Sequence, residues 1–388
     1  MGMKFFKKIA KKQLISETVI ISVVFGLAAG IVGQILADVY INPWRQDYVS
    51  QQFEVNQGIS NLTPELQKVK KFLGIQQDFE VSNSVLKAAP SLVGIYQKKK
   101  PSSEILNQIY LTQDLLGNGF ILTSDGWLVS HGSVISSLDS KQLVVAHGNT
   151  TYSVERAVTD SVTGIVFLKI SADNLPVALL GDSGENSYGQ LAIALNFLKE
   201  VAVTNIKNPG YQSGNKPQDF ILSSEKYPDL ILLENNLADS YLGAPLLNLV
   251  GEVTGVVSEI SSDNKVITAV PISQFRPIIL SILRDNLIKR PYLGINYINL
   301  AKAVGIDSTI TGKLGALVYQ NSVKLSPAAA ADLKSGDIIV AVEGQTVNAD
   351  NNLTALVQQY QPGDELTFEI IRDKKTIEKK IILSVQPE

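Results

Sequence analysis

Short apolar runs separated by turn residues dominate the chain from about Val81 onward. Runs of this length, bounded by Gly, Asp, Asn and Ser, predict β-strands. Many such strands at this spacing indicate a barrel or a sandwich. Examples are SLVGIY (91–96), GNGFILT (117–123), WLVS (127–130), QLVVAHG (142–148), GIVFLKI (164–170), QLAIAL (190–195), LILL (230–233) and GEVTGVV (251–257).

Helix-length apolar periodicity first follows these strands at residues 274–286, QFRPIILSILRDN, where a domain would end. A different unit begins at Arg290. It contains strands, a predicted helix at about 351–359, and a final hairpin in FEIIRDKKTIEKKIIL with Asp373 in the turn. We therefore expect a separate small domain at the C-terminal end.

The N-terminal region carries a different pattern. Five lysines within residues 4–12 precede an uncharged apolar stretch, residues 19–36. With its two neighbours, this stretch approaches the roughly 20 residues that cross a hydrocarbon core. We predict a transmembrane helix at 18–37, with a cytoplasmic basic tail at 1–17, because lysines favour the cytoplasmic side. A cleaved signal peptide and a buried core helix are the alternatives.

Residues 38–80 are polar and mixed, and we interpret them as a stalk. Thr63, followed by Pro64 and Glu65, is typical of a helix start. Gly74 is a candidate for the end of this helix. The sequence thus predicts one short helix in the stalk.

The composition narrows the range of possible functions. The 388 residues suggest two or three domains, and the net charge of -3 gives no indication of nucleic-acid binding. The chain contains no Cys and only two histidines, His131 and His147. A protein-only zinc site is therefore not expected, and no cofactor is predicted.

Several longer motifs follow one another between residue 81 and residue 388. They are LGNGFILTSDGWLVSHGSVI (116–135), DSVTGIVFLKI (160–170), SYLGAPLLNLVGEVTGV (240–256), AVPIS (269–273), RPYLGI (290–295) and SPAAAADLKSGDIIVAVEGQTV (326–347). They resemble the motifs of the HtrA (Deg) family of serine proteases and occur in that family's order, which is more specific than any one motif alone.

The resemblance implies a mainly β fold: a trypsin-like double β-barrel at 81–289, then a PDZ domain at 290–388. With the tail, the transmembrane helix and the stalk, this gives a single-pass protein of the cell membrane. Its N-terminus would be cytoplasmic and its bulk extracytoplasmic.

The three catalytic positions of that family hold residues that cannot perform its chemistry. A triad needs a hydroxyl nucleophile, an imidazole base and a carboxylate that orients the imidazole. Aligned without gaps, the family's His, Asp and Ser fall on Ser133, Gly164 and Leu242. Two glycines of the family's nucleophile loop are replaced by Ser240 and Ala244. The resemblance therefore predicts a catalytically degenerate member.

A displaced triad of His131, Asp160 and Ser240 is the alternative. A two-residue shift along a strand keeps a side chain on the same face but moves it about 6–7 Å. Triad members must meet at about 2.6–3.2 Å, so all three would have to shift together. In the simpler interpretation His131 is a strand-end residue, Ser240 a loop serine, and His147 a hairpin-turn residue.

The PDZ motifs are better preserved. In the resemblance, Tyr292, Leu293, Gly294 and Ile295 correspond to a loop whose backbone N–H groups hold a peptide's terminal carboxylate, while the next strand pairs with the peptide. Three further residues complete the predicted site: Leu353 and Leu356 as the floor of the pocket, and Arg290 as a residue that attracts the carboxylate. Leu293, Ile295 and Leu356 can equally be core residues.

Three functions remain open. The first is a binding or scaffolding pseudoprotease that recognises peptide C-termini or unfolded chains, as a homotrimer or with active relatives. The second is an active endopeptidase that uses the displaced residues. The third is a structural role in which neither site binds anything.

Overall fold

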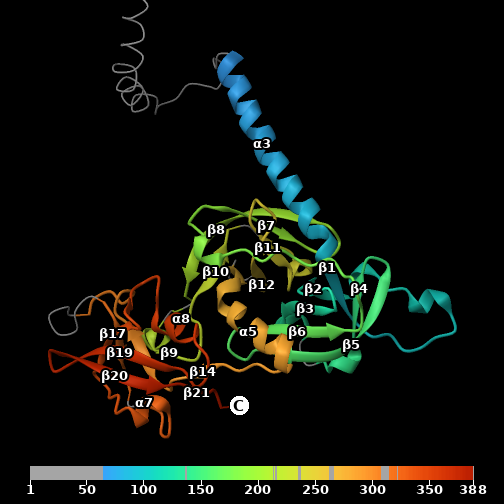
Figure 1. Cartoon of the computed structure of the whole chain (residues 1–388). Helices are drawn as coiled ribbons and strands as arrows, with labels where there is room; N and C mark the ends of the chain where they lie inside the picture. The colour runs from blue at the N-terminus through green and yellow to red at the C-terminus, as the bar shows by residue number, and fades with distance from the viewer. Residues whose placement is uncertain are drawn as a thin grey trace, which may run out of the picture. The chain divides into compact units, whose positions relative to one another are not determined.

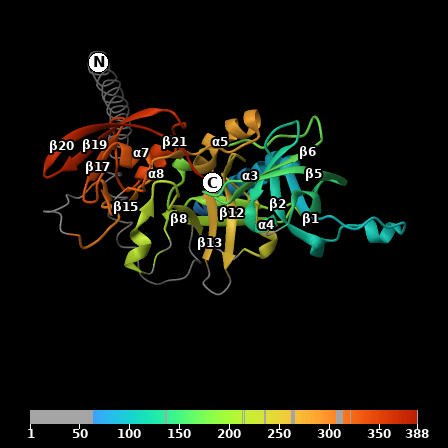
Figure 2. The same ribbon diagram turned by 90° about the horizontal axis from the view of Figure 1, so that it is seen from below.

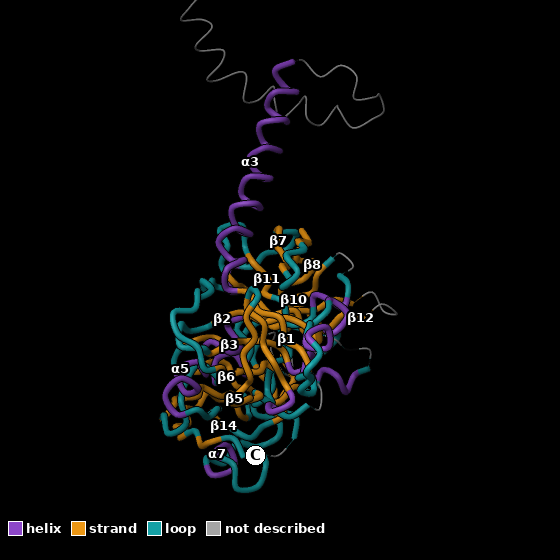
Figure 3. The backbone as a smooth tube through the Cα atoms, turned by 90° about the vertical axis from the view of Figure 1, so that its right-hand side faces the viewer, coloured by secondary structure: helices purple, strands orange, loops and turns teal. Residues whose placement is uncertain are grey.

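The computed structural model describes residues 64–387, apart from 136–137, 213, 215, 235–236, 262–265, 307–313 and 321. Within these residues strands predominate (Figure 3). The predicted transmembrane segment, 18–37, lies outside the described residues. Among the helices that are described, none combines the length and apolar character needed to cross a membrane.

Six antiparallel strands close the first barrel in the order β1-β2-β3-β6-β5-β4 (Figure 1). Alternating and continuous apolar runs fill its interior, as the sequence predicts, and short turns join β2 to β3, β4 to β5 and β5 to β6. The strands are β1 (Leu92–Gln97), β2 (Leu115–Ile121), β3 (Trp127–His131), β4 (Leu143–His147), β5 (Thr150–Thr159) and β6 (Ile165–Ile170).

The second barrel has the order β10-β13-β12-β11-β7-β8. Strand β12 contacts β3 of the first barrel, and Figure 2 shows β12 on the side of β13 that faces the first barrel. The helix α5, Ile272–Asp285, follows β13 where the apolar periodicity predicts a helix. The strands are β7 (Leu191–Leu195), β8 (Val201–Tyr211), β10 (Leu230–Leu233), β11 (Pro245–Leu247), β12 (Val253–Ser261) and β13 (Val266–Pro271).

One apolar core joins the two barrels. Phe120 and Phe167 of the first barrel share a buried cluster with Ile193 and Val256 of the second and with Phe275 of α5. Because large aromatic side chains lie fully inside this cluster, the two barrels are held together by burial of apolar surface.

The helix α3, Pro64–Ala88, corrects the prediction of a short helix that stops at Gly74. The start at Pro64 is as predicted, but the helix continues past Gly74. A glycine inside a helix costs only about 1 kcal/mol relative to Ala. Val81, Val85 and Ala88 pack against the barrel core, and this packing outweighs that cost.

The C-terminal domain has its own core and a sheet ordered β20-β19-β17-β16-β15-β9, to which β18 adds on β17. The predicted hairpin is present, and Asp373 lies in its turn with a positive φ. The elements are β14 (Pro291–Tyr292), β15 (Asn296–Asn299), β16 (Ala316–Val318), α7 (Pro327–Ala330), β17 (Ile338–Val342), β18 (Gln345–Thr346), α8 (Leu353–Val357), β19 (Glu365–Arg372), β20 (Lys375–Ile382) and β21 (Ser384–Val385).

The edge strand β9, Leu222–Ser223, does not come from this domain's own sequence. It lies between β8 and β10 of the second barrel in the chain, yet it pairs antiparallel with β15. In Figure 1, β9 lies among the orange and red elements of the C-terminal domain. A segment of the barrel region therefore completes the sheet of the C-terminal domain.

Candidate functional site

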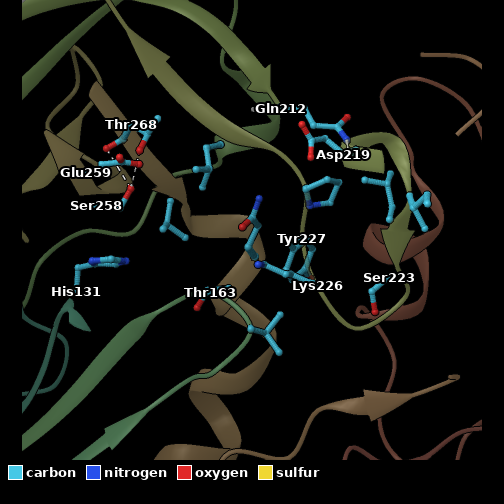
Figure 4. Close-up of a pocket in the computed structure, with 17 residues that line it drawn as sticks. His131, Thr163, Gln212, Asp219, Ser223, Lys226, Tyr227, Ser258, Glu259 and Thr268 are labelled. Carbon is cyan, nitrogen blue, oxygen red and sulfur yellow. Dashed lines mark hydrogen bonds between the residues drawn. The ribbon is translucent and has the colours of Figure 1, made fainter. Parts of the chain in front are cut away.

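A cavity of about 640 Å³ lies where the barrels meet the segment 219–230 (Figure 4). His131 and Thr163 contribute from the first barrel, and Ser258, Glu259 and Thr268 from the second. The wall formed by the segment includes Asp219, Ile221, Leu222, Ser223, Lys226 and Tyr227. Of the candidate catalytic residues, His131 lines this cavity.

His131 ends β3, and its ring Nδ1 lies 2.8 Å from Ser133 Oγ. Ser133 Oγ also donates to the carbonyl of Ser258 at 3.2 Å. Burial lowers the pKa of His131 to about 4, and a hydrogen bond with the Thr163 backbone opposes this shift only in part. The imidazole is therefore neutral near pH 7.

Gly164 has a φ of 73°, in the left-handed region that glycine adopts readily. A Cβ at this position would lie 2.8 Å from His131 Nε2, so the ring occupies the space that any side chain here would need. The position expected to carry an orienting carboxylate instead accommodates the histidine ring.

Asp160 is buried, and its carboxylate forms an ion pair with Arg290. Arg290 Nη2 donates to Asp160 Oδ2 at 2.5 Å and Arg290 Nε donates to Oδ1 at 3.2 Å. Thr163 Oγ1 donates to Oδ2 at 2.5 Å. Among the described residues, no hydrogen bond joins Asp160 to His131 or either of them to Ser240. Thr163 bonds to both Asp160 and His131, but in the described part of the chain the three members of the displaced triad do not bond directly to one another.

Leu242 follows a short 3₁₀ turn, η9 (Asp239–Tyr241), and packs against the core of the first barrel. Its N–H donates to Asp239 O at 3.0 Å. An oxyanion hole requires donors aimed at the reacting carbonyl. The N–H of Leu242 is therefore already engaged in a hydrogen bond within its own turn.

Asn118 holds this loop in place, a role that the sequence interpretation missed. The fully buried side chain donates from Nδ2 to the carbonyls of Ser240 at 2.7 Å and Leu242 at 3.0 Å. Its Oδ1 accepts from the N–H of Phe197 at 2.8 Å. The only sequence signal was its place inside GNGF.

The loop before β15 holds a carboxylate. The N–H groups of Leu293 and Gly294 donate to Glu225 Oε1 at 3.1 and 2.9 Å. The N–H of Ile295 donates to Ser224 Oγ at 3.1 Å, and Ser224 N donates back to Ile295 O at 3.0 Å. Two backbone donors that converge on one oxygen form a carboxylate site.

Leu353 and Leu356, on α8, are fully buried in the same core as Leu222 of β9. Thr354 lies between them, and its hydroxyl donates to the carbonyl of Ser223 at 2.8 Å. Thr354 also contacts Tyr297 OH at 2.9 Å. Sequence reasoning did not single out Thr354, because a threonine in a short helix carries no distinctive signal.

Arg290 is not positioned as predicted. Its guanidinium pairs with Asp160, donates to Gln274 O at 2.9 Å and lies over the ring of Tyr227. These partners lie in the barrel region, so Arg290 does not serve the carboxylate at Leu293 and Gly294. Tyr292 pairs with Ser384 in a two-stranded sheet, and burial, reinforced by the charge of Glu225, raises the pKa of its phenol.

Comparisons with known proteins fit this architecture. Residues 117–256 match the family model of a trypsin-like peptidase domain, and residues 291–383 match that of a PDZ domain. The solved structure of the HtrA-type protease AlgW with tripeptide aligns over 79% of this chain and 98% of its own, with a TM-score of 0.59 and 22% identity. At that identity the likeness shows the fold.

Curated relatives extend the match. A probable periplasmic serine endoprotease DegP-like of Marinomonas sp. is 31% identical over 282 residues, which are 70% of this chain and 57% of the relative. Its counterpart in Halomonas elongata is 28% identical over 264 residues, 66% of this chain and 54% of the relative. The putative serine protease HhoB of Synechocystis sp. is 28% identical over 269 residues, 67% of this chain and 64% of the relative.

Fold and matches together define a trypsin-like peptidase domain followed by a PDZ domain. The chain is therefore of the HtrA/DegP type in its architecture. It spans little more than half the length of the DegP-like relatives that it matches.

Proposed function

We propose that this protein is a membrane-anchored, extracytoplasmic pseudoprotease that binds the C-termini of peptides or unfolded proteins through its PDZ domain. It would serve protein quality control as a scaffold or regulator. The single observation that carries the binding role is the carboxylate held by the N–H groups of Leu293 and Gly294.

The loss of catalysis is supported by the side chains at the three family positions. Ser133 offers a hydroxyl where a base is needed, Gly164 offers no carboxylate, and Leu242 cannot attack a carbonyl. The neutral ring of His131 contacts Ser133 Oγ, and the N–H of Leu242 donates to the carbonyl of Asp239 in its own turn. These features agree in favouring a site without acyl transfer.

The periplasmic DegP-like names of the relatives and the predicted span at 18–37 both support an extracytoplasmic location. AlgW has been solved with a tripeptide and with a decapeptide, which supports peptide binding by the same fold. A homotrimer, or a hetero-oligomer with active relatives, is the assembly expected from the family resemblance.

The alternative, an active endopeptidase that uses His131, Asp160 and Ser240, is disfavoured by the partners of these residues. Asp160 would have to give up a buried ion pair with Arg290 before it could orient an imidazole. Breaking a buried pair leaves an uncompensated charge, which is strongly destabilising.

A fluorophosphonate probe and a C-terminal peptide array together test the proposal. We expect no probe on Ser133 or Ser240 by mass spectrometry, and binding of peptides with a free C-terminal carboxylate but not of their amides. Labelling of Ser240 that disappears in His131→Ala would support the active-enzyme alternative. Failure to bind any peptide, with no labelling, would favour the structural role.

A further inference from the structure

We propose that residues 222–225, Leu-Ser-Ser-Glu, are a built-in ligand of the PDZ groove, so that an incoming C-terminus binds only by displacing them. This inference rests on the proposed function, because it concerns the regulation of the same groove. The competitor of an incoming C-terminus is a segment of the chain's own peptidase-like region.

The segment binds as an added strand. Ser223 opposes Asn296 and Leu222 opposes Tyr297, antiparallel to β15. Side chains two residues apart on a strand share a face. Leu222 and Ser224 are accordingly both buried, whereas Ser223 between them is half-buried. The pairing is that of a peptide added to a sheet edge.

Glu225 supplies the negative charge that a C-terminus would bring. Its Oε1 accepts from the N–H groups of Leu293 and Gly294 and from Ser224 Oγ at 2.6 Å. Ser223 Oγ donates to Oε2 at 3.0 Å. A side-chain carboxylate thus occupies the backbone site that would receive a terminal carboxylate directly after Ser224.

Further bonds tie the same segment to the PDZ domain. Gln358 Nε2 donates to the Ser224 carbonyl at 3.3 Å, in addition to the bond from Thr354 to Ser223. A little further along the chain, Asp229 forms a salt bridge with Lys302 at 2.6 Å and accepts from Asn352 Nδ2 at 2.7 Å. The segment is therefore bound to the PDZ domain through the pairing of β9 with β15, through the Glu225 carboxylate and, just beyond it, through Asp229.

Displacement would also change the barrel cleft. Ile221, Leu222 and Ser223 form part of the wall of the 640 Å³ cavity that contains His131. A peptide that takes the place of the segment would remove this wall. Capture of a C-terminus in the PDZ groove is thereby coupled to opening of the cavity that His131 lines.

Only molecules whose groove is free can bind an external peptide. The apparent affinity is therefore the intrinsic affinity multiplied by the fraction of molecules with a free groove. Glu225→Gln keeps the shape of the side chain but removes the charge from the carboxylate site. Charged hydrogen bonds are roughly twice as strong as neutral ones. We expect the variant to bind external peptide about tenfold more tightly than the wild type.

The probe is a fluorescein-labelled peptide copying residues 216–224, KPQDFILSS, with a free carboxylate on the last serine. Anisotropy titrations use the full-length chain, and the C-terminally amidated peptide is the negative control. Glu378→Gln is the matched variant, because Glu378 is exposed on β20 at the opposite edge of the sheet from β9. Equal affinity of wild type and Glu225→Gln would overturn the inference.

A disulfide provides a second, independent readout in this cysteine-free chain. Ser223 and Asn296 oppose each other, at a separation within disulfide range for antiparallel strands. We expect the double variant Ser223→Cys/Asn296→Cys to cross-link on mild oxidation and to lose peptide binding by at least about tenfold until it is reduced. Excess probe peptide should slow cross-linking.

The two readouts separate failure of the inference from failure of the proposed function. Absence of the cross-link would show that residues 222–225 do not occupy the groove, and would overturn the inference. A cross-link that forms, with no peptide bound by wild type, by Glu225→Gln or by the reduced double variant, would support occupancy but contradict the peptide-binding function.

Discussion

At the scale of single residues, the most consequential contact is the buried ion pair between Asp160 of the first barrel and Arg290, which directly precedes the residues that match a PDZ domain. Both side chains are nearly fully buried. Their separation in sequence is 130 residues. The contact therefore connects the peptidase-like domain to the PDZ domain rather than serving either candidate site.

We predict that Asp160→Asn lowers the free energy of unfolding by about 3–5 kcal/mol, because it leaves the Arg290 charge buried without a partner. The double variant Asp160→Leu/Arg290→Met should lose less, because it removes both charges. Differential scanning calorimetry measures both. Equal loss in the single and double variants would show that packing, not charge, dominates this contact.

His131 predicts a pH dependence. Its pKa lies below the ordinary value of 6.5, at about 4. Between these values the unfolded chain binds a proton that the folded protein excludes, so the stabilising contribution is complete above pH 6.5 and is lost as the pH falls toward 4. The loss has an upper limit of about 3 kcal/mol.

Denaturant unfolding between pH 4 and pH 7 measures this contribution. His131→Gln should show a weaker decline in stability over this range than the wild type, whereas His147→Gln should retain the decline that depends on His131. An unchanged slope in His131→Gln would show that the imidazole titrates normally.

The residue scale also marks a limit of sequence reasoning. The assignment of Ser133, Gly164 and Leu242 to the family's catalytic positions is a prediction that motif order alone provides. The partner of Arg290 does not, because nothing in RPYLGI reveals a carboxylate 130 residues earlier in the chain. Long-range polar contacts depend on how the domains pack, and local pattern carries no information about that.

At the scale of elements, apolar periodicity predicted most strands of both barrels, the helix α5 and the final hairpin. It missed β5, whose residues TTYSVERAVT are mostly exposed and polar. It also missed β9, a two-residue strand that exists only because β15 offers an edge. Strands defined by their partners rather than by an apolar face give little signal in one sequence.

β9 leads to a prediction about local stability. Leu222→Asp would place a charge at a site that is 8% exposed, so β9 should leave its place on β15 more often. We expect trypsin to cleave after the exposed Lys226 on the order of tenfold faster, because cleavage requires local opening. Leu325→Asp, at a fully exposed leucine, is the control and should change little. Unchanged cleavage in Leu222→Asp would show that β9 is not what protects the segment.

At the scale of the whole molecule, the order of domains was predictable because several motifs follow one another along the chain in the family's order. The two barrels and the PDZ domain confirm that part. The occupied groove was not predictable, because the ligand, LSSE, resembles an ordinary loop. Its function becomes visible only when the fold brings it to the carboxylate loop.

The predicted anchor also belongs to this scale. We predict that the full chain stays in the membrane pellet after alkaline carbonate extraction, whereas a variant lacking residues 1–37 is released. The physical reason is the uncharged stretch at 19–36. Release of the full chain at alkaline pH would contradict an uncleaved transmembrane helix.

Digestion of unfolded casein by the purified full-length chain tests the central claim most directly. The claim is that the peptidase-like domain no longer cleaves peptide bonds, because base, acid and nucleophile positions hold Ser133, Gly164 and Leu242. We predict no release of casein fragments above that of a preparation carrying Ser133→Ala, Ser240→Ala and His131→Ala together. Fragment release by the wild type that this triple variant abolishes would contradict it.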